Sequence, residues 1–168
     1  FGYGMYYVCR LSLNVVKKPI VDEGIFSETE LGIIGSVLFF TYALGKFTNG
    51  FLADRSNINR FMTTGLLVTA LVNLCLGFTH SYILFALLWG FSGWFQSMGA
   101  ASCVGGLSRW FENKNRGSFY GFWSASHNIG EAMTFIIVAS IVSALGWRYG
   151  FIGAGSIGII GALIVWRF

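Results

Sequence analysis

Four ionisable side chains lie within otherwise apolar stretches of the sequence: Arg10, Lys46, His127 and Glu131. An ionised side chain at the centre of a lipid bilayer costs roughly 2.5–3.5 kcal/mol. Arg10, Lys46 and Glu131 would together cost about 8–10 kcal/mol if they faced lipid. We therefore expect these side chains to face one another or a water-filled interior.

Helical spacing places aromatic and hydroxyl side chains beside these groups. Residues three or four apart share one face of a helix, and three such stripes are present: Tyr3, Tyr7, Arg10 and Asn14; Tyr42 and Lys46; and Trp123, His127, Glu131 and Thr134. Two permanent cations, a titratable histidine and tyrosine hydroxyls suit an anion with tetrahedral oxygens better than a neutral sugar or a cation. We expect a phosphate ester, held by a forked contact to Arg10, a point charge on Lys46 and the titratable His127.

Structural roles are open alternatives for the same residues. The side chain of Arg10 or Lys46 could extend to a membrane interface, with its charged end in water. His127 could be a core histidine that is hydrogen-bonded to a neighbouring helix. Glu131 could form a structural ion pair with Lys46, Arg10 or His127, carry a proton, or lower the affinity for an anion.

The composition predicts the elements that position these residues. Hydrophobic residues make up 55% of the chain and charged residues 11%, whereas a soluble domain has about 25% charged residues. Several apolar stretches approach or reach the roughly 20 residues that cross about 30 Å of hydrocarbon. We predict an all-α polytopic membrane protein whose residues 1–168 form one six-helix transmembrane domain, with spans at 1–18, 28–52, 61–79, 83–109, 118–145 and 149–167.

The distribution of basic residues predicts the orientation. With the N-terminus in the cytoplasm, Lys17, Lys18 and Arg148 lie outside, and six basic residues lie inside: Arg55, Arg60, Arg109, Lys114, Arg116 and Arg167. An excess of Lys and Arg marks the cytoplasmic loops of membrane proteins. The net charge of +4 therefore reflects topology, and we expect no nucleic-acid partner.

Several classes of protein and site are not expected. The chain opens on Phe1 with no Met start, basic segment or cleavage site, so we interpret it as a piece of a longer protein rather than as starting with a signal peptide. Cys9, Cys75 and Cys103 have no paired spacing, so neither a disulfide nor a metal site is expected. The sequence has no Walker-type glycine loop and no nucleophile–base pair at useful spacing, so we expect neither an enzyme nor a cofactor.

Small residues recur at every fourth position in two of the predicted helices. One set is Gly117, Gly121 and Ala125, and the other is Gly150, Ala154, Gly158 and Ala162. Small residues allow the backbones of two membrane helices to approach closely. We therefore predict that both sets form seams between packed helices.

The turn between the second and third predicted spans combines an acid with two basic residues. It contains Gly50, Asp54, Arg55 and Arg60, which could clamp helix ends through charge-assisted hydrogen bonds; alternatively, Asp54 simply ends a helix near solvent. The segment resembles the G-x-L-A-D-R-x-x-x-x-R/K loop of the major facilitator superfamily. The resemblance implies a gating role for the loop and a 12-helix fold of two six-helix halves around a central substrate site. This chain would be the N-terminal half, with a C-terminal half as its partner.

The fifth predicted helix resembles the organophosphate:phosphate antiporter family within that superfamily. The pattern R-G-x5-W-N-x2-H-N-x-G-G is matched by Arg116, Gly117, Trp123, His127, Asn128 and Gly130, with Ser124 and Glu131 as departures. Tyr3, Tyr6, Tyr7, Arg10, Tyr42 and Lys46 are also similar to the family, although Leu11 replaces a common Lys. The resemblance implies a monomeric protein in the bacterial inner membrane that exchanges an organophosphate for inorganic phosphate by alternating access. The implied site residues are Arg10, Lys46, His127, Tyr3, Tyr7, Tyr42 and Trp123.

The identity of the substrate and the type of function have alternatives. Ala100 is small where glycerol-phosphate carriers tend to have Trp, so the resemblance favours hexose 6-phosphate over glycerol 3-phosphate. A membrane-embedded hexose-phosphate sensor of the same fold would use the same residues. A proton-coupled facilitator of another organic anion is a third hypothesis, which depends on Glu131 and the two signature mismatches.

Overall fold

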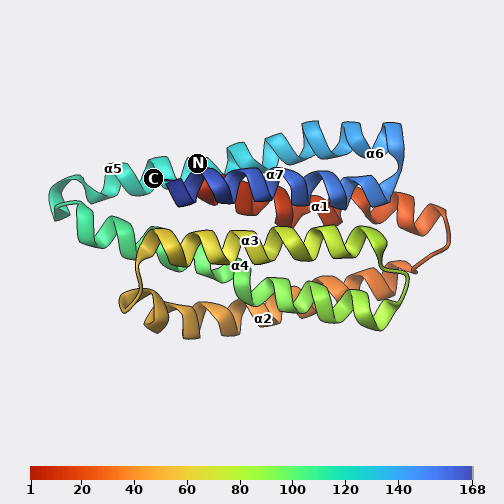
Figure 1. Cartoon of the computed structure of the whole chain (residues 1–168), viewed down its shortest axis with the longest axis horizontal. Helices are drawn as coiled ribbons and strands as arrows, with labels where there is room; N and C mark the ends of the chain where they lie inside the picture. The colour runs from red at the N-terminus through yellow and green to blue at the C-terminus, as the bar shows by residue number, and fades with distance from the viewer. Residues whose placement is uncertain (168) are drawn as a thin grey trace.

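The computed structural model describes residues 1–167, and every regular element in that range is helical. The elements are α1 (Gly2–Asp22), α2 (Glu28–Asp54), α3 (Ile58–Phe78), α4 (Tyr82–Trp110), α5 (Asn113–Met133), the π-helix η1 (Thr134–Val138), α6 (Ala139–Leu145) and α7 (Trp147–Arg167). The segments α5, η1 and α6 follow one another without a break and form one long rod (Figure 1). The prediction of an all-α fold is confirmed.

Five helical segments of the described chain are long and apolar enough to cross a membrane. They are Glu28–Asp54, Ile58–Phe78, Tyr82–Trp110, Asn113–Leu145 and Trp147–Arg167. The remaining helix, α1, is 21 residues long but carries Arg10, Lys17 and Lys18, which lower its hydropathy. Neighbouring helices cover its apolar face, where Val8, Cys9 and Val16 are fully buried. The prediction of membrane-spanning helices is thus confirmed for five segments, and the charges of α1 set it apart from them.

Short turns with defined caps join the helices. At the start of α2, the backbone N–H of Glu30 donates to the Ser27 hydroxyl at 3.2 Å, and the Ser27 N–H donates to the Glu30 carboxylate at 2.8 Å. These reciprocal bonds form a capping box, which fixes the first residue of the helix. Gly146, with a φ of +94°, makes the turn between α6 and α7 at a backbone conformation that favours glycine. Because the turns are short, each long helix runs antiparallel to the one that follows it in the chain.

The helices pack unequally around the bundle. α2 packs mainly on α4, α3 packs on α7 and α4, and α1 packs on α7 and α5, whereas α1 and α2 touch only slightly. Both chain ends lie toward the same side of the bundle as the α2–α3 and α4–α5 turns (Figure 1). We call this side the Asp54 end and the opposite one the Glu23 end. The sparse contact between α1 and α2 leaves room for a cavity.

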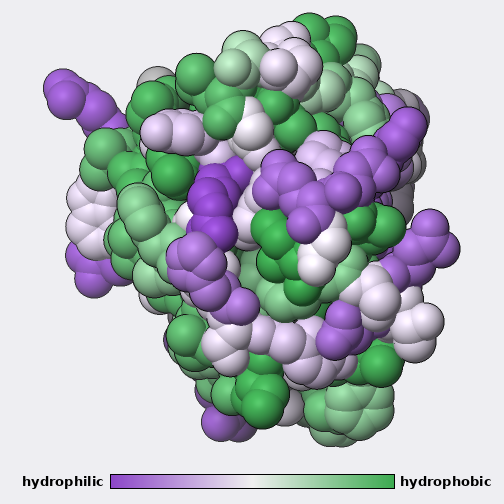
Figure 2. Space-filling model, turned by 90° about the vertical axis from the view of Figure 1, so that its right-hand side faces the viewer, coloured by the Kyte–Doolittle hydropathy of each residue, from purple (hydrophilic) through white to green (hydrophobic). Residues whose placement is uncertain are grey.

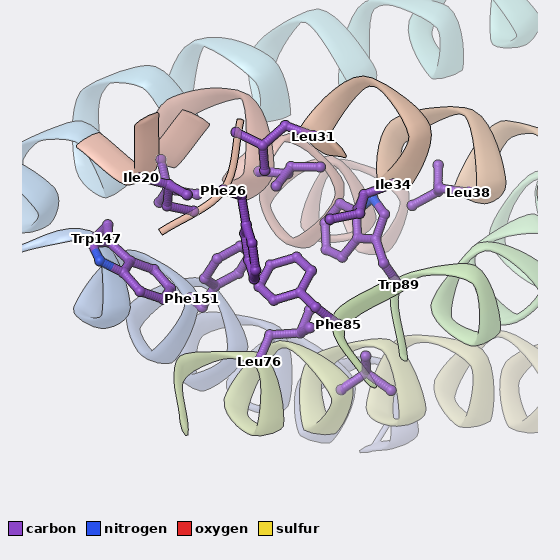
Figure 3. Packing of buried hydrophobic residues seen from close by; sticks show 13 residues of the cluster. Ile20, Phe26, Leu31, Ile34, Leu38, Leu76, Phe85, Trp89, Trp147 and Phe151 are labelled. Atoms are coloured by element: carbon purple, nitrogen blue, oxygen red, sulfur yellow. The ribbon is translucent and has the colours of Figure 1, made fainter. Parts of the chain in front are cut away.

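The largest hydrophobic cluster lies toward the Glu23 end. Phe26, Phe85 and Phe151 point toward one another in Figure 3, with Phe85 in edge contact with Phe26 and Phe151 at centroid distances of 5.5 Å. The Trp147 indole N–H donates to the Glu23 carboxylate at 2.9 Å, and Arg148 donates to the Gly77 carbonyl at 3.2 Å. These bonds tie three turns together over the aromatic core.

One of the two predicted small-residue seams is confirmed. A Cβ added to Gly158 in α7 would lie 2.6 Å from the Cys9 sulfur and 2.8 Å from the Ala70 Cβ. For α5 the seam stays a prediction, because a Cβ on Gly117 or Gly121 would meet no atom within 4 Å among the described residues. The start of α5 extends along the open side of the bundle, where no other described helix covers this face.

Candidate anion-binding site

A cavity of about 630 Å³ lies between α1, α2, α4 and α5 and extends to the Asp54 end; we call it the main cavity. Its polar lining includes Tyr3, Lys46 and Trp123, and Ala100 and Gly105 are among its small lining residues. A volume of this size is typical of a small-molecule site. The prediction that polar stripes share a common interior is therefore consistent with the cavity.

Two cations share the ring of Tyr42. The Arg10 guanidinium carbon lies 4.0 Å from the Tyr42 ring centroid, and the Lys46 ammonium lies 5.0 Å from it. Arg10 also lies near the rings of Tyr7 and Phe39, at 5.7 and 5.5 Å. Aromatic faces attract cations but carry no net charge. The rings therefore orient both cations and leave their positive charges available to an anion.

No carboxylate neutralises these cations. Within residues 1–167, the single ion pair with an N–O distance of 4.0 Å or less joins Arg109 to Asp54. Glu131 was one candidate for a structural ion pair with Lys46, Arg10 or His127, and the described residues contain no such pair. Glu131 is half-buried in α5. The positive charge of the site is therefore uncompensated by the described part of the chain.

A second chain of aromatic contacts joins α1 to α5. The Tyr3 ring lies 5.0 Å from Trp123 and 5.4 Å from Tyr7, and the Tyr7 ring lies 5.3 Å from the His127 ring. The buried indole N–H of Trp123 donates to no acceptor among the described residues. A buried donor without a partner costs free energy that a ligand oxygen can recover. The aromatic contacts therefore connect Tyr3, which lines the main cavity, to His127. In the same way, the Tyr42 ring connects Lys46, which also lines that cavity, to Arg10.

A backbone crossing positions this second chain. A Cβ on Gly130 would lie 2.5 Å from the Gly4 carbonyl oxygen and 2.9 Å from the Gly4 Cα, so the backbones of α1 and α5 are in contact. One turn later the Thr134 hydroxyl donates to the Gly130 carbonyl at 2.7 Å, where the π-helix η1 begins. Segments of π-helix often occur at functional sites. The crossing sets Tyr3 and Tyr7 against Trp123 and His127.

Asn49 ties α2 to α4 one turn after Lys46 and was not among the predicted site residues. Its side-chain N–H₂ donates to the Trp94 carbonyl at 3.0 Å and to the Ser97 hydroxyl at 2.6 Å, and the residue is fully buried. The Trp94 indole adds a bond to Thr48 at 3.0 Å. The sequence feature that could have identified Asn49 is an amide side chain in an apolar helix, three residues after Lys46. These bonds fix α2 against α4 beside the main cavity.

Replacing Asn49 by alanine is expected to destabilise the protein by about 1–3 kcal/mol, because the change removes the partner of two buried polar groups. The thermal unfolding midpoint of the purified full-length protein would show the loss. Thr64→Ala is the matched control, since the exposed Thr64 hydroxyl bonds only to the Arg60 carbonyl of its own helix. Equal midpoints for the two variants would contradict the role of Asn49.

The loop at the Asp54 end is closed by a cation from another helix. Arg109 at the end of α4 donates to the Asp54 and Ala53 carbonyls at 2.6 and 3.3 Å, and lies 3.5 Å from the Asp54 carboxylate. Arg55 and Arg60, which were also expected to clamp helix ends, are exposed and form no ion pair in the described chain. Arg109 fulfils that role because α4 ends beside α2, whereas Arg55 and Arg60 project from the turn into solvent. Gly50, also expected in this loop, lies in α2 and lines the main cavity.

Helices of membrane-spanning length around a cavity lined by an unpaired cation, Lys46, define a polytopic membrane protein with a candidate site for an anion. The chain belongs to the major facilitator superfamily, which it matches over residues 1–168. Its relatives are in the organophosphate:phosphate antiporter family, so the predicted resemblance is confirmed.

Three relatives illustrate the kinds of protein to which the chain is similar. The membrane sensor protein UhpC of Salmonella typhimurium is 35% identical over 167 residues, covering 99% of this chain and 38% of the relative. A probable hexose phosphate transport protein of Chlamydia pneumoniae is 41% identical over 147 residues, covering 88% and 32%. The glycerol-3-phosphate transporter of Haemophilus influenzae is 32% identical over 148 residues, covering 84% and 31%. The chain thus spans about a third of the length of these relatives.

Proposed function

We propose that the chain is the N-terminal six-helix half of a secondary transporter that exchanges an organophosphate for inorganic phosphate by alternating access. The observation that carries the proposal is the pair of cations on the Tyr42 ring, Arg10 and Lys46, with no carboxylate within 4.0 Å of either in the described chain. Hexose-phosphate and glycerol-3-phosphate transporters among the relatives support this substrate class. The protein lies as a monomer in the bacterial inner membrane, with the Asp54 end in the cytoplasm.

The cation pair gives a physical reason for exchange rather than net transport. Arg10 binds two phosphate oxygens in a forked contact, Lys46 adds a point charge, and His127 and the Trp123 N–H complete the hydrogen bonds. Without an anion, closing the two halves would bury both positive charges together, which is unfavourable in a low-dielectric interior. A bound phosphate removes this cost, so the halves rock only when phosphate or its ester occupies the site.

The test is counterflow in liposomes. The full-length protein is reconstituted in vesicles loaded with labelled inorganic phosphate, and efflux is followed after adding glucose 6-phosphate, glycerol 3-phosphate or an unrelated anion outside. Efflux that one phosphate ester drives, and the unrelated anion does not, is the expected result. Efflux at the same rate with no external anion would contradict obligatory exchange.

A sensor is the second candidate, because the membrane sensor protein UhpC aligns with 99% of this chain at 35% identity. A sensor would bind hexose phosphate through the same residues without substantial turnover. Binding of glucose 6-phosphate by the purified protein, combined with exchange at the background of empty vesicles, would establish this alternative.

Ala100→Trp is expected to lower hexose 6-phosphate exchange about tenfold and to leave glycerol 3-phosphate exchange within about threefold, because steric misfit in a pocket is worth roughly 1–3 kcal/mol. Ala100 lines the main cavity, where an indole would occupy space needed by the larger sugar. Exchange rates of the two esters in the same vesicles make this comparison, so glycerol 3-phosphate serves as the internal control. Selective loss of glycerol 3-phosphate exchange would contradict the preference for sugar phosphates.

A further inference from the structure

A small cavity between α1 and α2 continues from the candidate site toward the Glu23 end. Its volume is about 60 Å³, enough to hold water, and we call it the linking cavity. The residues that matter among its lining are Arg10, Asn14 and Lys17 from α1, and Gly35, Phe39 and Trp89 from α2 and α4. Arg10, Asn14 and Lys17 follow helical spacing, so they lie on one face of α1.

A larger cavity of about 490 Å³ lies at the Glu23 end and is lined by Lys17, Lys18, Asp22 and Glu28 together with Leu31 and Gly32; we call it the outer cavity. Hydrophilic side chains are grouped across this end of the bundle, with hydrophobic ones around them (Figure 2). Lys17 lines both the outer and the linking cavity. The two cavities are therefore neighbours along the α1–α2 groove, with Lys17 between them.

Positive charge increases inward along this groove. The outer cavity has two lysines and two carboxylates in its lining, whereas the linking cavity has Arg10 and Lys17 and no carboxylate. The other acids of this end, Glu23 and Glu30, are not in the lining of either cavity and are bonded to the Trp147 indole and to Ser27. Neither lysine forms an ion pair in the part of the chain that the structure describes. An anion that enters the outer cavity is therefore attracted inward to Lys17.

Two glycines keep the groove open. A Cβ on Gly32 or on Gly35 would meet no atom within 4 Å in the described structure. Lys17 is seven residues after Arg10, which is about 10.5 Å along a helix axis. Both side chains are long and flexible enough to turn toward the space between them, so an anion can pass from one to the other.

We propose that Lys17 and Asn14 form an outer phosphate-binding subsite, which receives the phosphate group of the substrate from the outer side and passes it to Arg10. The ammonium group of Lys17 supplies the charge, and the Asn14 amide supplies a hydrogen-bond donor. The inference rests on the proposed exchange function and extends it, because it assigns a binding step to a residue outside the Arg10–Lys46–His127 site.

The test measures KM for inorganic phosphate separately on each side of the membrane, using the full-length protein in vesicles of known orientation. Lys17→Gln is expected to raise the outer-side KM about tenfold, since loss of local charge slows capture of an anion, and to leave the inner-side KM within about twofold. The outer-side KM of the variant is also expected to depend less on salt concentration than that of the wild type. Lys17→Arg, which keeps the charge, is expected to restore the wild-type value.

Lys18→Gln is the matched control, because Lys18 is exposed, lies one residue further along, and does not line the linking cavity. An equal rise in KM on both sides, no rise for Lys17→Gln, or the same rise for Lys18→Gln would overturn the inference. Absence of exchange by the wild type would instead contradict the proposed function. In that case the subsite is judged from the dissociation constant of inorganic phosphate, which Lys17→Gln should raise and Lys18→Gln should not.

Discussion

Arg10→Lys is expected to reduce phosphate exchange about a hundredfold or more, although the substitution keeps the positive charge. Arginine donates to two phosphate oxygens at once from a planar group, whereas lysine offers one compact ammonium. A charge-assisted hydrogen bond contributes about 1.5–3 kcal/mol, and the cation–π contact roughly 0.5–2 kcal/mol. Since 1.4 kcal/mol corresponds to about a factor of ten, losing one such hydrogen bond and the cation–π contact accounts for a reduction of about a hundredfold or more.

The ring contacts explain why lysine cannot replace arginine at this position. The Arg10 guanidinium carbon lies 4.0 Å from the Tyr42 centroid and within 5.7 Å of two further rings. These rings suit a flat, weakly hydrated cation, and they hold it in one orientation before the anion arrives. A lysine ammonium in the same place would retain more of its hydration and would lack the planar pair of donors that matches two phosphate oxygens.

Counterflow of labelled phosphate in vesicles, together with the dissociation constant of inorganic phosphate, measures this prediction. Arg167→Lys is the control, because Arg167 is exposed at the end of α7, away from the main cavity. The control should exchange phosphate at the wild-type rate. Exchange by Arg10→Lys within threefold of wild type would show that charge alone is sufficient and would remove the forked contact from the proposal.

The three polar stripes were predictable from the sequence because helical periodicity and the cost of burying charge act locally. Those two rules place Tyr42 beside Lys46 and Trp123 beside His127 without any knowledge of packing. Which stripes meet is also constrained, since ionised groups in a membrane have few alternatives to a shared interior. The sequence therefore supplied the residues of the candidate site, and the structure supplied the pairings Arg10–Tyr42 and Tyr7–His127.

The errors occurred where partners are distant in sequence. Asp54, Arg55 and Arg60 were expected to clamp neighbouring helix ends, but the cation that reaches Asp54 is Arg109, 55 residues later. The stripe that contains Gly117 and Gly121 looks like the one in α7, yet only the α7 stripe faces another described helix. Periodicity shows that one face of a helix consists of small residues. It does not show which other helix, if any, packs against that face. Asn49 was missed for the same reason, because its partners Trp94 and Ser97 are on another helix.

Gly130→Ala is expected to abolish most exchange, by about a hundredfold, because a displacement of roughly 1 Å at a site can cost that much. The new methyl group would lie 2.5 Å from the Gly4 carbonyl oxygen and 2.9 Å from its Cα. These are backbone atoms, so no side chain can rotate to make room, and α1 must move away from α5. Overpacking of this kind also costs about 1–3 kcal/mol of stability.

Separation of the two helices would break the contacts that bridge them. The Tyr3–Trp123 and Tyr7–His127 ring pairs bridge the same two helices, at centroid distances of 5.0 and 5.3 Å. A shift of α1 also carries Arg10 with it, so the change should affect phosphate affinity as well as turnover. The dissociation constant of inorganic phosphate should therefore rise, and the exchange rate should fall.

Gly106→Ala is the matched control for this substitution. Gly106 is a buried helical glycine in α4, and a Cβ there would lie 3.8 Å from the nearest Ile58 atom, an ordinary van der Waals distance. Alanine is favoured over glycine in a helix by about 1 kcal/mol, so this variant should be as stable as wild type or slightly more stable, and should exchange phosphate normally. If Gly130→Ala matched it in exchange rate and thermal midpoint, the close approach of α1 and α5 would not be what positions the site.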